Sequence, residues 1–393
     1  MKIVERDLKK NLQKLATYFP VVSLTGPRQS GKSTLVQDAF PSYNYVTFDD
    51  PNLRKMASED PVGFMHNIKV PVIIDEAQIV PELFNLIKLY VDQHDNVGDI
   101  ILSGSQNFLL TKKIGESLAG RVGIAKLLPY SYMEVSKTGN ARSMDDFIYE
   151  GGYPRKYTDD IPCDLFYSSY IETYIQRDVD DYLDVRNLND FKNLIRLLSQ
   201  NCGQLLNYSR FASDLKISIQ TVKKWISILE SSYIIYLLPS YSKNLRKQII
   251  KAPKLYFYDT GLLCNLLNIN NVSEMLRHEK FGSVFENFVI SERIKYSFNM
   301  LESFHLCYYR DTSRHEIDLI DDTDPFSAVA TEIKSGMTFQ DKFNNVMKNS
   351  DNLLNQNDVI KNIVYRGAQS FIYNGTQVYN IDDWINELYE IPK

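Results

Sequence analysis

The chain lacks any apolar run long enough to cross a membrane. A membrane-spanning helix needs roughly 18–20 consecutive apolar residues, whereas the densest apolar run here, Tyr233 to Leu238, has the length of a single strand. Residues 1–20 carry charges throughout and lack the apolar centre of a signal peptide. We therefore expect a folded, cytoplasmic protein with no membrane partner.

Cysteine is scarce and widely spaced. No two of the four cysteines form a CxxC pair, which argues against a disulfide framework and against a zinc knuckle. This cysteine usage is typical of a reducing compartment. The four are Cys163, Cys202, Cys264 and Cys307.

An excess of one charge sign is also missing. Lys and Arg number 44 and Asp and Glu number 49, which gives a formal net charge of −5 over 393 residues. This balance excludes a uniformly basic nucleic-acid coat, but it allows a local basic surface because a mean charge hides its distribution. The chain length and the 44% hydrophobic content predict a globular protein of two or three domains.

The first motif is a phosphate-binding loop that follows a short apolar strand, Val21 to Thr25. The loop matches the pattern GxxxxGK[ST] and leads into a predicted helix. Its glycines let consecutive backbone N–H groups close around phosphate oxygens, and the positive N-terminus of the helix points at the same anion. Lys32 would reach the β- and γ-phosphates, and the Ser33 hydroxyl would ligate Mg²⁺. The predicted nucleotide-binding residues are Gly26, Pro27, Arg28, Gln29, Ser30, Gly31, Lys32, Ser33 and Thr34.

A second apolar strand, Val70 to Ile74, ends in two acidic residues. This pattern is typical of a Walker B strand, in which Asp75 would hold Mg²⁺ through water and Glu76 would polarise the attacking water. The alternative is a buried strand that simply ends in an acidic turn.

A third strand, Ile100 to Ser103, ends in further polar residues. Ser105 and Gln106 could sense the γ-phosphate or orient the water, or they could be plain turn residues. Arg121 could act on a phosphate as an arginine finger or sensor, or lie on the surface. Because strands alternate with helices, this part predicts a parallel sheet with the nucleotide at the carboxyl ends of the strands.

These motifs, together with later stretches, resemble the AAA+-like ATPases of prokaryotes that carry a DUF4143 carboxyl-terminal region. The resemblance covers nearly the whole chain. It implies ATP and Mg²⁺ as cofactors, an ATP-binding domain, a winged-helix region and a final domain akin to PD-(D/E)XK nucleases. Relatives often form rings in which an arginine completes a neighbour's site, a role that Arg121 could have in a homo-oligomer. The later stretches are Glu150 to Pro154, Tyr174 to Asp178 and Tyr256 to Leu262.

The middle of the chain predicts a winged helix. Two short helices, Ser209 to Leu215 and Ser218 to Ser231, precede two apolar strands, Tyr233 to Leu238 and Lys254 to Tyr258. Five basic residues and no acidic one lie between Ser231 and Tyr258, which favours contact with the DNA backbone, although a contact with another domain or subunit is the alternative. The possible DNA-binding residues are Lys223, Lys224, Lys243, Arg246, Lys247 and Lys251, and Lys254 completes the basic run.

The last third predicts a carboxylate-rich metal site. Glu332 and Lys334 lie two apart on a strand and therefore share a face, and Asp318 joins them if its strand pairs with theirs. Two carboxylates and a lysine on one patch suit Mg²⁺-dependent phosphodiester hydrolysis. The resemblance matches Asp318, Glu332 and Lys334 to the PD-(D/E)XK pattern, with Glu286 as the helical acid. Such folds are also used for binding alone.

These observations predict an α/β protein of three domains, at residues 1–140, 141–271 and 272–393. We expect a Mg²⁺-dependent ATPase that couples its nucleotide state to the handling of DNA or a protein partner. An ATP-gated, Mg²⁺-dependent DNA nuclease and a nucleotide-bound adaptor that does not hydrolyse ATP are the alternatives.

Overall fold

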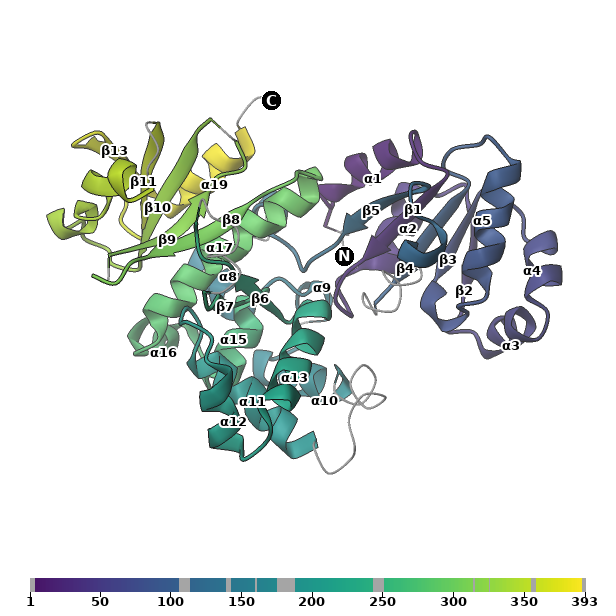
Figure 1. The fold of residues 1–393 in the computed structure, drawn as a ribbon, viewed down its shortest axis with the longest axis horizontal. Coiled ribbons are helices and arrows are strands. Elements are labelled where there is room, and N and C mark those ends of the chain that lie inside the picture. The colour runs from purple at the N-terminus through teal and green to yellow at the C-terminus, as the bar shows by residue number, and fades with distance from the viewer. Residues whose placement is uncertain are drawn as a thin grey trace.

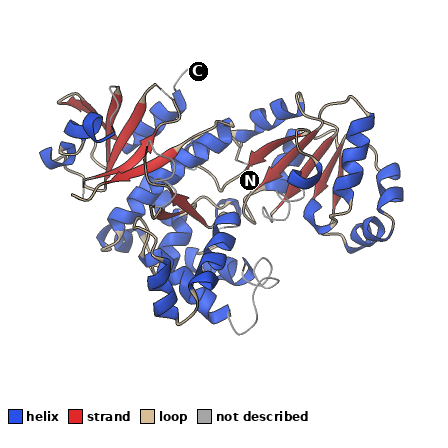
Figure 2. Ribbon diagram, viewed as in Figure 1, coloured by secondary structure: helices blue, strands red, loops and turns tan. Residues whose placement is uncertain are grey.

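The computed structural model describes residues 4–105, 114–138, 143–159, 161–174, 188–242, 251–313, 315–324, 326–354 and 358–390. The strands gather into two large sheets at opposite ends of the molecule, and helices with one small sheet fill the region between them (Figures 1 and 2). Within the described ranges, no helix has both the length and the apolar character that crossing a membrane requires.

The first sheet has five parallel strands in the order β2-β3-β4-β1-β5, as the alternation of strands and helices predicts. Strands β1, β3 and β4 are buried along their whole length because apolar clusters pack on the sheet from both sides. The elements are α1 (Leu8–Ala16), β1 (Val21–Thr25), α2 (Lys32–Ala39), β2 (Asn44–Thr47), α3 (Pro51–Glu59), α4 (Pro61–Asn67), β3 (Val72–Asp75), η1 (Ala77–Ile79), α5 (Leu83–Gln93), β4 (Ile100–Gly104) and β5 (Val122–Lys126).

The register of this sheet gathers its polar strand ends at one edge. Thr25, the last residue of β1, pairs with Gly104, and Asp75, the last residue of β3, pairs with Ser103. Since all five strands are parallel, the loops that follow β1, β3 and β4 leave the sheet side by side.

The central region is helical and contains one two-stranded antiparallel sheet, in which Leu238 of β6 pairs with Lys254 of β7. Helices α12 and α13 and this hairpin follow one another in the order that the sequence predicts, while their assignment as a winged helix stays a prediction. The elements are α7 (Tyr132–Ser136), α8 (Met144–Glu150), α9 (Pro154–Thr158), α10 (Cys163–Tyr174), α11 (Leu188–Gln200), α12 (Tyr208–Leu215), α13 (Ile219–Ser231), β6 (Ile235–Leu238), β7 (Lys254–Phe257), α15 (Thr260–Leu266) and α16 (Val272–Arg277).

Buried Asp259 joins two distant stretches of this region. Its carboxylate accepts hydrogen bonds from the Gly152 backbone N–H at 2.7 Å and from the Tyr167 hydroxyl at 2.8 Å. Gly151 has a φ of 72°, and a Cβ there would lie 2.2 Å from the Tyr167 hydroxyl. Only glycine therefore fits this turn, which brings Pro154 next to Gly31 of the phosphate-binding loop.

The second large sheet is mixed, with the order β12-β13-β11-β10-β9-β8. Strands β10, β11 and β13 are parallel to one another, while β9 pairs antiparallel with both β8 and β10. The elements are α17 (Phe281–Met300), β8 (Leu306–Arg310), β9 (Glu316–Asp321), β10 (Ala328–Lys334), η5 (Asp341–Asn344), η6 (Met347–Asn349), α18 (Ser350–Leu354), β11 (Val359–Tyr365), β12 (Phe371–Tyr373), β13 (Thr376–Asn380) and α19 (Ile381–Glu390).

Helix α17 joins the central helices to this sheet. Of its 20 residues, 14 are buried, including the charged Glu292 and Lys295. One continuous apolar cluster runs from the central helices through α17 to α19 and to Leu319 and Ile333 of the sheet. The central and carboxyl-terminal regions therefore share a core instead of meeting at a flexible linker.

Candidate functional site

The phosphate-binding loop is shaped by two glycines. Gly31 has a φ of 91° at the start of α2, and Gly26 has a φ of 155°. A Cβ at position 26 would lie 2.0 Å from the carbonyl oxygen of Leu127, so a side chain there would push the loop away from β5. The Lys32 ammonium lies over the loop and donates to the carbonyls of Gly26 and Pro27 at 3.0 and 2.7 Å.

Asp75, at the carboxyl end of β3, accepts hydrogen bonds from several groups around the loop. Its Oδ2 accepts hydrogen bonds from the hydroxyls of Ser33 and Tyr45, both at 2.7 Å. Its Oδ1 accepts from Ser103 Oγ and from the Glu76 backbone N–H at 3.2 Å. Burial and the bond to Asp75 raise the pKa of Tyr45 to about 12, which keeps that hydroxyl a donor. Ser33 of α2 and Asp75 of β3, the two metal ligands predicted for the nucleotide site, are thus in direct contact.

Glu76 lies next to Asp75 in the left-handed region, with a φ of 53°. Its Oε2 accepts hydrogen bonds from Gln78 Nε2 at 2.5 Å and from Ser105 Oγ at 3.3 Å. The structure therefore brings Ser105 to the predicted catalytic carboxylate, whereas Gln106 lies outside the described residues. No role was predicted for Gln78, whose position two residues after Glu76 is the only signal that the sequence offers.

A cavity of about 400 Å³ lies over these residues. The loop, Glu76 and Ser105 form one side, and three side chains of helix α10 form the other, so the central region closes the site. The pattern of α10 alone gives no sign of this contact. The lining residues are Arg28, Gln29, Gly31, Lys32, Ser33, Thr34, Glu76, Ser105, Tyr170, Thr173 and Tyr174.

The polar groups at this site suit the binding of a nucleoside triphosphate with Mg²⁺. A hydroxyl and a carboxylate oxygen are the hard ligands that Mg²⁺ prefers. The glycine-shaped loop and the N-terminus of α2 form an anion cradle, and the Ser30 hydroxyl in the loop is buried with no hydrogen-bond partner among the described residues.

Arg6 also supports this loop, although no motif in the sequence indicates it. The Arg6 guanidinium, 7% exposed, donates to the carbonyls of Ser30 at 2.9 Å and Leu128 at 2.7 Å. It also forms an ion pair with Glu134 at 3.0 Å and lies over the Tyr130 ring. This clamp holds the loop against the segment that leaves β5.

Arg121 does not contribute to the site of its own chain. Arg121 immediately precedes β5, and Val122 pairs with Val21 at the amino ends of the strands. The cavity lies at the carboxyl ends of the strands, so Arg121 is on the opposite side of the sheet from it. There it forms an ion pair with Asp92 at 2.5 Å. A role in the nucleotide site of another copy stays a prediction.

A second polar centre lies between α17 and the second large sheet. The antiparallel register of β9 and β10, with Ala330 opposite Ile320, places Asp318 opposite Glu332. Lys334 Nζ lies 2.5 Å from Glu332 Oε1 and 3.6 Å from Asp318 Oδ2. The predicted pairing of these two strands is therefore present, and the three predicted residues meet.

Lys254 of β7 brings Glu286 into the same group, which we call the carboxylate cluster: Glu286, Glu316, Asp318 and Glu332 with Lys254 and Lys334. The Lys254 ammonium lies 3.1 Å from Glu286, 2.5 Å from Glu316 and 3.7 Å from Asp318. The Tyr256 hydroxyl donates to Glu286 at 2.5 Å. Lys254, Tyr256 and Glu316 were not predicted as members of this site.

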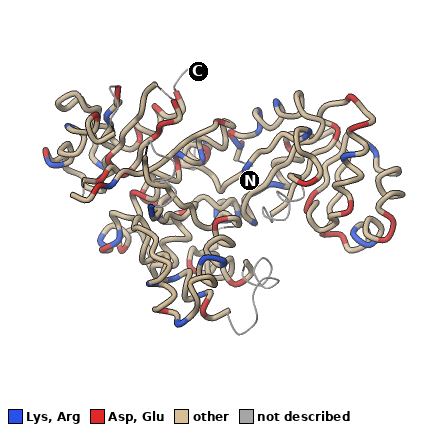
Figure 3. The backbone as a smooth tube through the Cα atoms, viewed as in Figure 1, with Lys and Arg blue, Asp and Glu red and all other residues tan. Residues whose placement is uncertain are grey.

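The position of Lys254 corrects the interpretation of the basic run. This lysine was counted with residues that face DNA, but it is only 1% exposed and is surrounded by carboxylates. Lys223 and Lys224 on α13 are exposed, as is Lys251. The remaining predicted DNA-binding residues, Lys243, Arg246 and Lys247, lie outside the described residues. Figure 3 shows basic and acidic residues intermixed along the described backbone.

The carboxylate cluster holds more negative than positive groups. Burial and the charge of Asp318 raise the pKa of Glu286 to about 7 and that of Glu332 to about 8. Burial alone would lower the pKa of Lys254 and Lys334, but the carboxylates outweigh it and raise both. When all six groups are ionised, the cluster has a net charge of −2, which one divalent cation would balance.

Three protein-family profiles match consecutive parts of the chain. An AAA domain matches residues 18–136, the domain of unknown function DUF8612 matches 141–273, and the domain of unknown function DUF4143 matches 281–384.

The chain is similar to uncharacterized proteins of Mycobacterium tuberculosis and Haemophilus influenzae. The uncharacterized protein Rv2008c of Mycobacterium tuberculosis is 30% identical over 323 residues, which cover 81% of this chain and 71% of that protein. An uncharacterized protein of Haemophilus influenzae is 23% identical over 424 residues, covering 97% and 98% of the two chains. Among solved structures, the Walker-type ATPase paby2304 of Pyrococcus abyssi superposes with a TM-score of 0.45 at 13% identity, covering 66% of this chain and 95% of that one.

We predict that two carboxyl groups of the carboxylate cluster, those of Glu286 and Glu332, titrate near neutral pH in the metal-free protein. Because the charge of Asp318 raises both pKa values, the Asp318→Asn substitution should lower the pKa of Glu286 and of Glu332. Infrared difference titration of the protonated carboxyl absorption would measure this shift. Asp351→Asn, which changes a carboxylate of α18 outside the cluster, should leave the titration unchanged. A wild-type protein with no carboxyl group titrating above pH 6 would contradict the electrostatic description.

Proposed function

We propose that this chain, which belongs to the family of AAA ATPases with a DUF4143 carboxyl-terminal region, binds ATP with Mg²⁺. We propose further that it hydrolyses the bond between the β- and γ-phosphates. The observation that carries this proposal is the contact of Ser33 with Asp75 at 2.7 Å. Ser33 and Glu76, the residue after Asp75, both line the cavity over the loop. A hydroxyl, a strand-end carboxylate and a second carboxylate in this order are the groups that phosphoryl transfer needs.

Each residue has a defined role in this reaction. When ATP binds, the Lys32 ammonium leaves the carbonyls of Gly26 and Pro27 and donates instead to oxygens of the β- and γ-phosphates. Ser33 and Asp75 would hold a Mg²⁺ ion, which would neutralise charge on the phosphate oxygens. Glu76 orients the attacking water and takes its proton, with Ser105 and Gln78 fixing the carboxylate. Tyr170, Thr173 and Tyr174 of α10 exclude bulk water.

Two substitutions separate binding from hydrolysis. Lys32→Ala should weaken ATP binding, measured by calorimetry, because it removes the cation that contacts the phosphates. Glu76→Gln should keep ATP binding but lower kcat by about 10²–10⁴-fold, the usual contribution of a general base.

Matched controls are Lys55→Ala and Glu59→Gln, an exposed pair on α3. Both should leave binding and turnover unchanged. Unaltered phosphate release in Glu76→Gln would refute the assigned role. A wild-type chain that binds ATP tightly without turnover would favour the adaptor alternative instead.

We further propose that the nucleotide state reaches the carboxylate cluster through the β6–β7 hairpin. The Tyr233 hydroxyl is 2.9 Å from Thr25 Oγ1, and Thr25 directly precedes the phosphate-binding loop. Tyr233 lies two residues before β6, and β6 pairs with the strand that carries Lys254. A shift of the loop that moves Thr25 would therefore move a cation of the carboxylate cluster.

The Tyr233→Phe variant tests this coupling. In a Glu76→Gln background, ATP should change the affinity of the cluster for Mn²⁺ several-fold, because typical coupling free energies correspond to about 5–150-fold. Tyr233→Phe removes only the hydroxyl and should reduce this effect, while Tyr236→Phe, which lies in the same hairpin, should not.

The Mn²⁺ affinity would be measured by electron paramagnetic resonance, with Asp318→Asn identifying the signal of the cluster. An affinity that is the same with and without ATP would contradict the coupling but leave the ATPase proposal intact.

A second candidate function is metal-dependent cleavage of phosphodiester bonds at the carboxylate cluster. It is favoured by Glu332 Oε2, which is buried and has no hydrogen-bond partner among the described residues, within a group whose net charge is −2 when ionised. Asp318 and Glu332 would ligate Mg²⁺, and Lys334 would stabilise the hydroxide. The exposed Lys223 and Lys224 on α13 support DNA as the partner.

Asp318→Asn and Lys334→Ala should each abolish Mg²⁺- or Mn²⁺-dependent DNA cleavage. Lys361→Ala, on the neighbouring strand β11 and paired with Asp351 outside the cluster, should retain it. Gel assays on single- and double-stranded DNA, with and without ATP, would follow the products. A wild-type chain that cuts none of these substrates would contradict the nuclease function and leave a binding role for the domain.

A further inference from the structure

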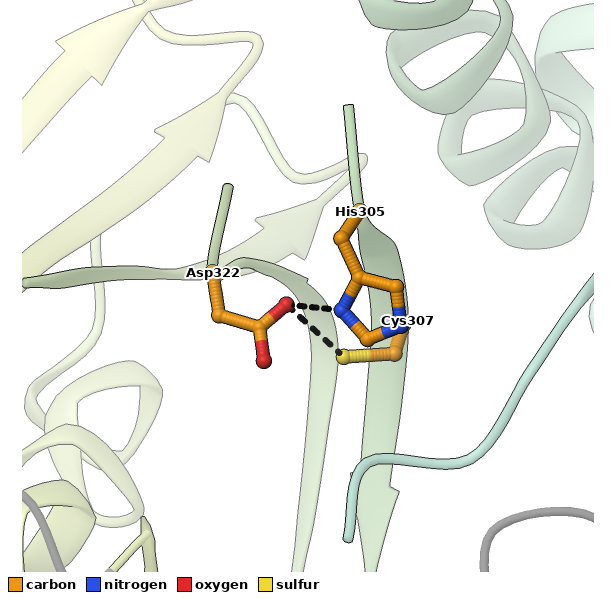
Figure 4. A group of neighbouring side chains, drawn as sticks. All are labelled: His305, Cys307 and Asp322. Carbon is orange, nitrogen blue, oxygen red and sulfur yellow. Dashed lines mark hydrogen bonds and ion pairs between the residues drawn. The ribbon is translucent and has the colours of Figure 1, made fainter. Parts of the chain in front are cut away.

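A group of three different side chains lies at the start of β8 and the end of β9 in the second large sheet (Figure 4). His305 directly precedes β8, Cys307 is the second residue of β8, and Asp322 directly follows β9. One potential ligand atom from each lies within 4.8 Å of the others. The group is separate from the carboxylate cluster, since Asp318 and Asp322 are four residues, or about 13 Å of extended strand, apart.

Backbone pairing fixes the positions of all three residues. Leu306 pairs with Asp321 in the antiparallel ladder of β8 and β9. The Asp322 N–H donates to the His305 carbonyl at 3.2 Å, and the His305 N–H donates to Thr323 Oγ1 at 2.9 Å. Ligands whose backbone is already held by hydrogen bonds need little ordering when an ion binds.

The side chains converge on one carboxylate oxygen. Asp322 Oδ1 contacts His305 Nδ1 and is also 4.0 Å from Cys307 Sγ (Figure 4). Among the described residues, the thiol makes one further polar contact, 3.8 Å from the Ile320 carbonyl. Both thiol contacts are long, so the sulfur gives up little when a metal ion replaces them.

Burial gives the group a closed and an open side. Cys307 is fully buried, the side chain of Asp322 is 19% exposed, and the side chain of His305 is 49% exposed. An ion can therefore enter past the imidazole, and a fourth coordination position would face water.

We propose that His305, Cys307 and Asp322 form a binding site for Zn²⁺ or a similar late first-row divalent cation. The ligands are His305 Nδ1, the Cys307 thiolate and an Asp322 oxygen, with water as the fourth. Metal–ligand lengths of about 2.0–2.3 Å put tetrahedral ligands about 3.3–3.7 Å apart, which small side-chain rotations reach from the present positions. On binding, the thiol proton passes to solvent and the sulfur–metal bond forms.

The ligand types distinguish this site from the two oxygen-rich sites. Thiolate and imidazole favour Zn²⁺, whereas the carboxylate cluster and the Ser33–Asp75 pair offer only oxygen and favour Mg²⁺. The bound ion would fasten the start of β8 to the end of β9, next to the Arg293–Asp321 ion pair that ties β9 to α17.

The chain contains a natural control at the other end of the same strands. His315 contacts Asp311 at 2.7 Å through Nδ1, as His305 contacts Asp322, and both imidazoles are half exposed. No thiol belongs to the His315–Asp311 pair, so it should not bind Zn²⁺ with comparable affinity.

The test titrates Zn²⁺ into the reduced full-length chain with a chromophoric chelator as competitor and excess Mg²⁺ to fill the oxygen sites. We expect one tight equivalent. His305→Ala and Cys307→Ser should each weaken Zn²⁺ affinity by at least about 100-fold. Loss of an outer-shell partner already costs ~10–100-fold in metal affinity, and these residues would contact the metal directly. His315→Ala should leave the Zn²⁺ affinity unchanged.

Two further readouts keep the result unambiguous. Co²⁺ in place of Zn²⁺ should give thiolate-to-metal charge-transfer absorption that Cys307→Ser abolishes. Zn²⁺ should also raise the melting temperature of the wild type but not of His305→Ala, an exposed change that does not disturb the core. Absence of a tight equivalent, or a tight equivalent that survives both substitutions, would overturn the proposal.

Discussion

The position of both candidate sites depends on a buried ion pair within helix α17. The side chains of Glu292 and Lys295 are 1% and 3% exposed and lie 2.8 Å apart. The Glu292 carboxylate accepts from the Tyr132 N–H at 2.8 Å, and Lys295 donates to the Tyr130 carbonyl at 3.0 Å. Breaking a buried pair of this kind costs about 3–5 kcal/mol. The chain that leaves the first sheet is therefore fastened to α17.

The same helix carries Glu286, six residues before Glu292, which is about 9 Å along its axis. One rigid element thus fixes the distance between the exit of the first sheet and the carboxylate cluster. The loop itself is held by Arg6 from one side and by Thr25–Tyr233 from the other. Since α10 also closes the nucleotide cavity, a movement of the central region would alter both sites together.

The sequence alone was sufficient to predict the phosphate-binding loop and the Asp75–Glu76 pair. A phosphate needs consecutive backbone amides, so its motif is contiguous, and a parallel sheet must bring its strand ends to one edge. The meeting of Asp318, Glu332 and Lys334 could also be predicted because strand side chains alternate with a period of two.

The remaining contacts depend on segments that are distant in sequence. Lys254 looks like part of a basic surface until β7 packs against α17 and buries it. Arg6 and Tyr170 have no motif that would mark them as neighbours of the loop. The motif context of Arg121 suggests a catalytic role, yet the strand direction places it at the amino ends of the strands, away from the cavity. For Lys254, Arg6 and Tyr170, long-range packing decides the position and local pattern does not.

Hydrogen exchange in the Glu76→Gln variant, with and without Mg²⁺-ATP, tests the central claim that the two sites belong to one connected structure. The account predicts that nucleotide slows exchange in the phosphate-binding loop and also in β6, β7 and the part of α17 around Glu286. Protection confined to the loop, α2 and α10, with unchanged exchange in β7 and α17, would contradict it.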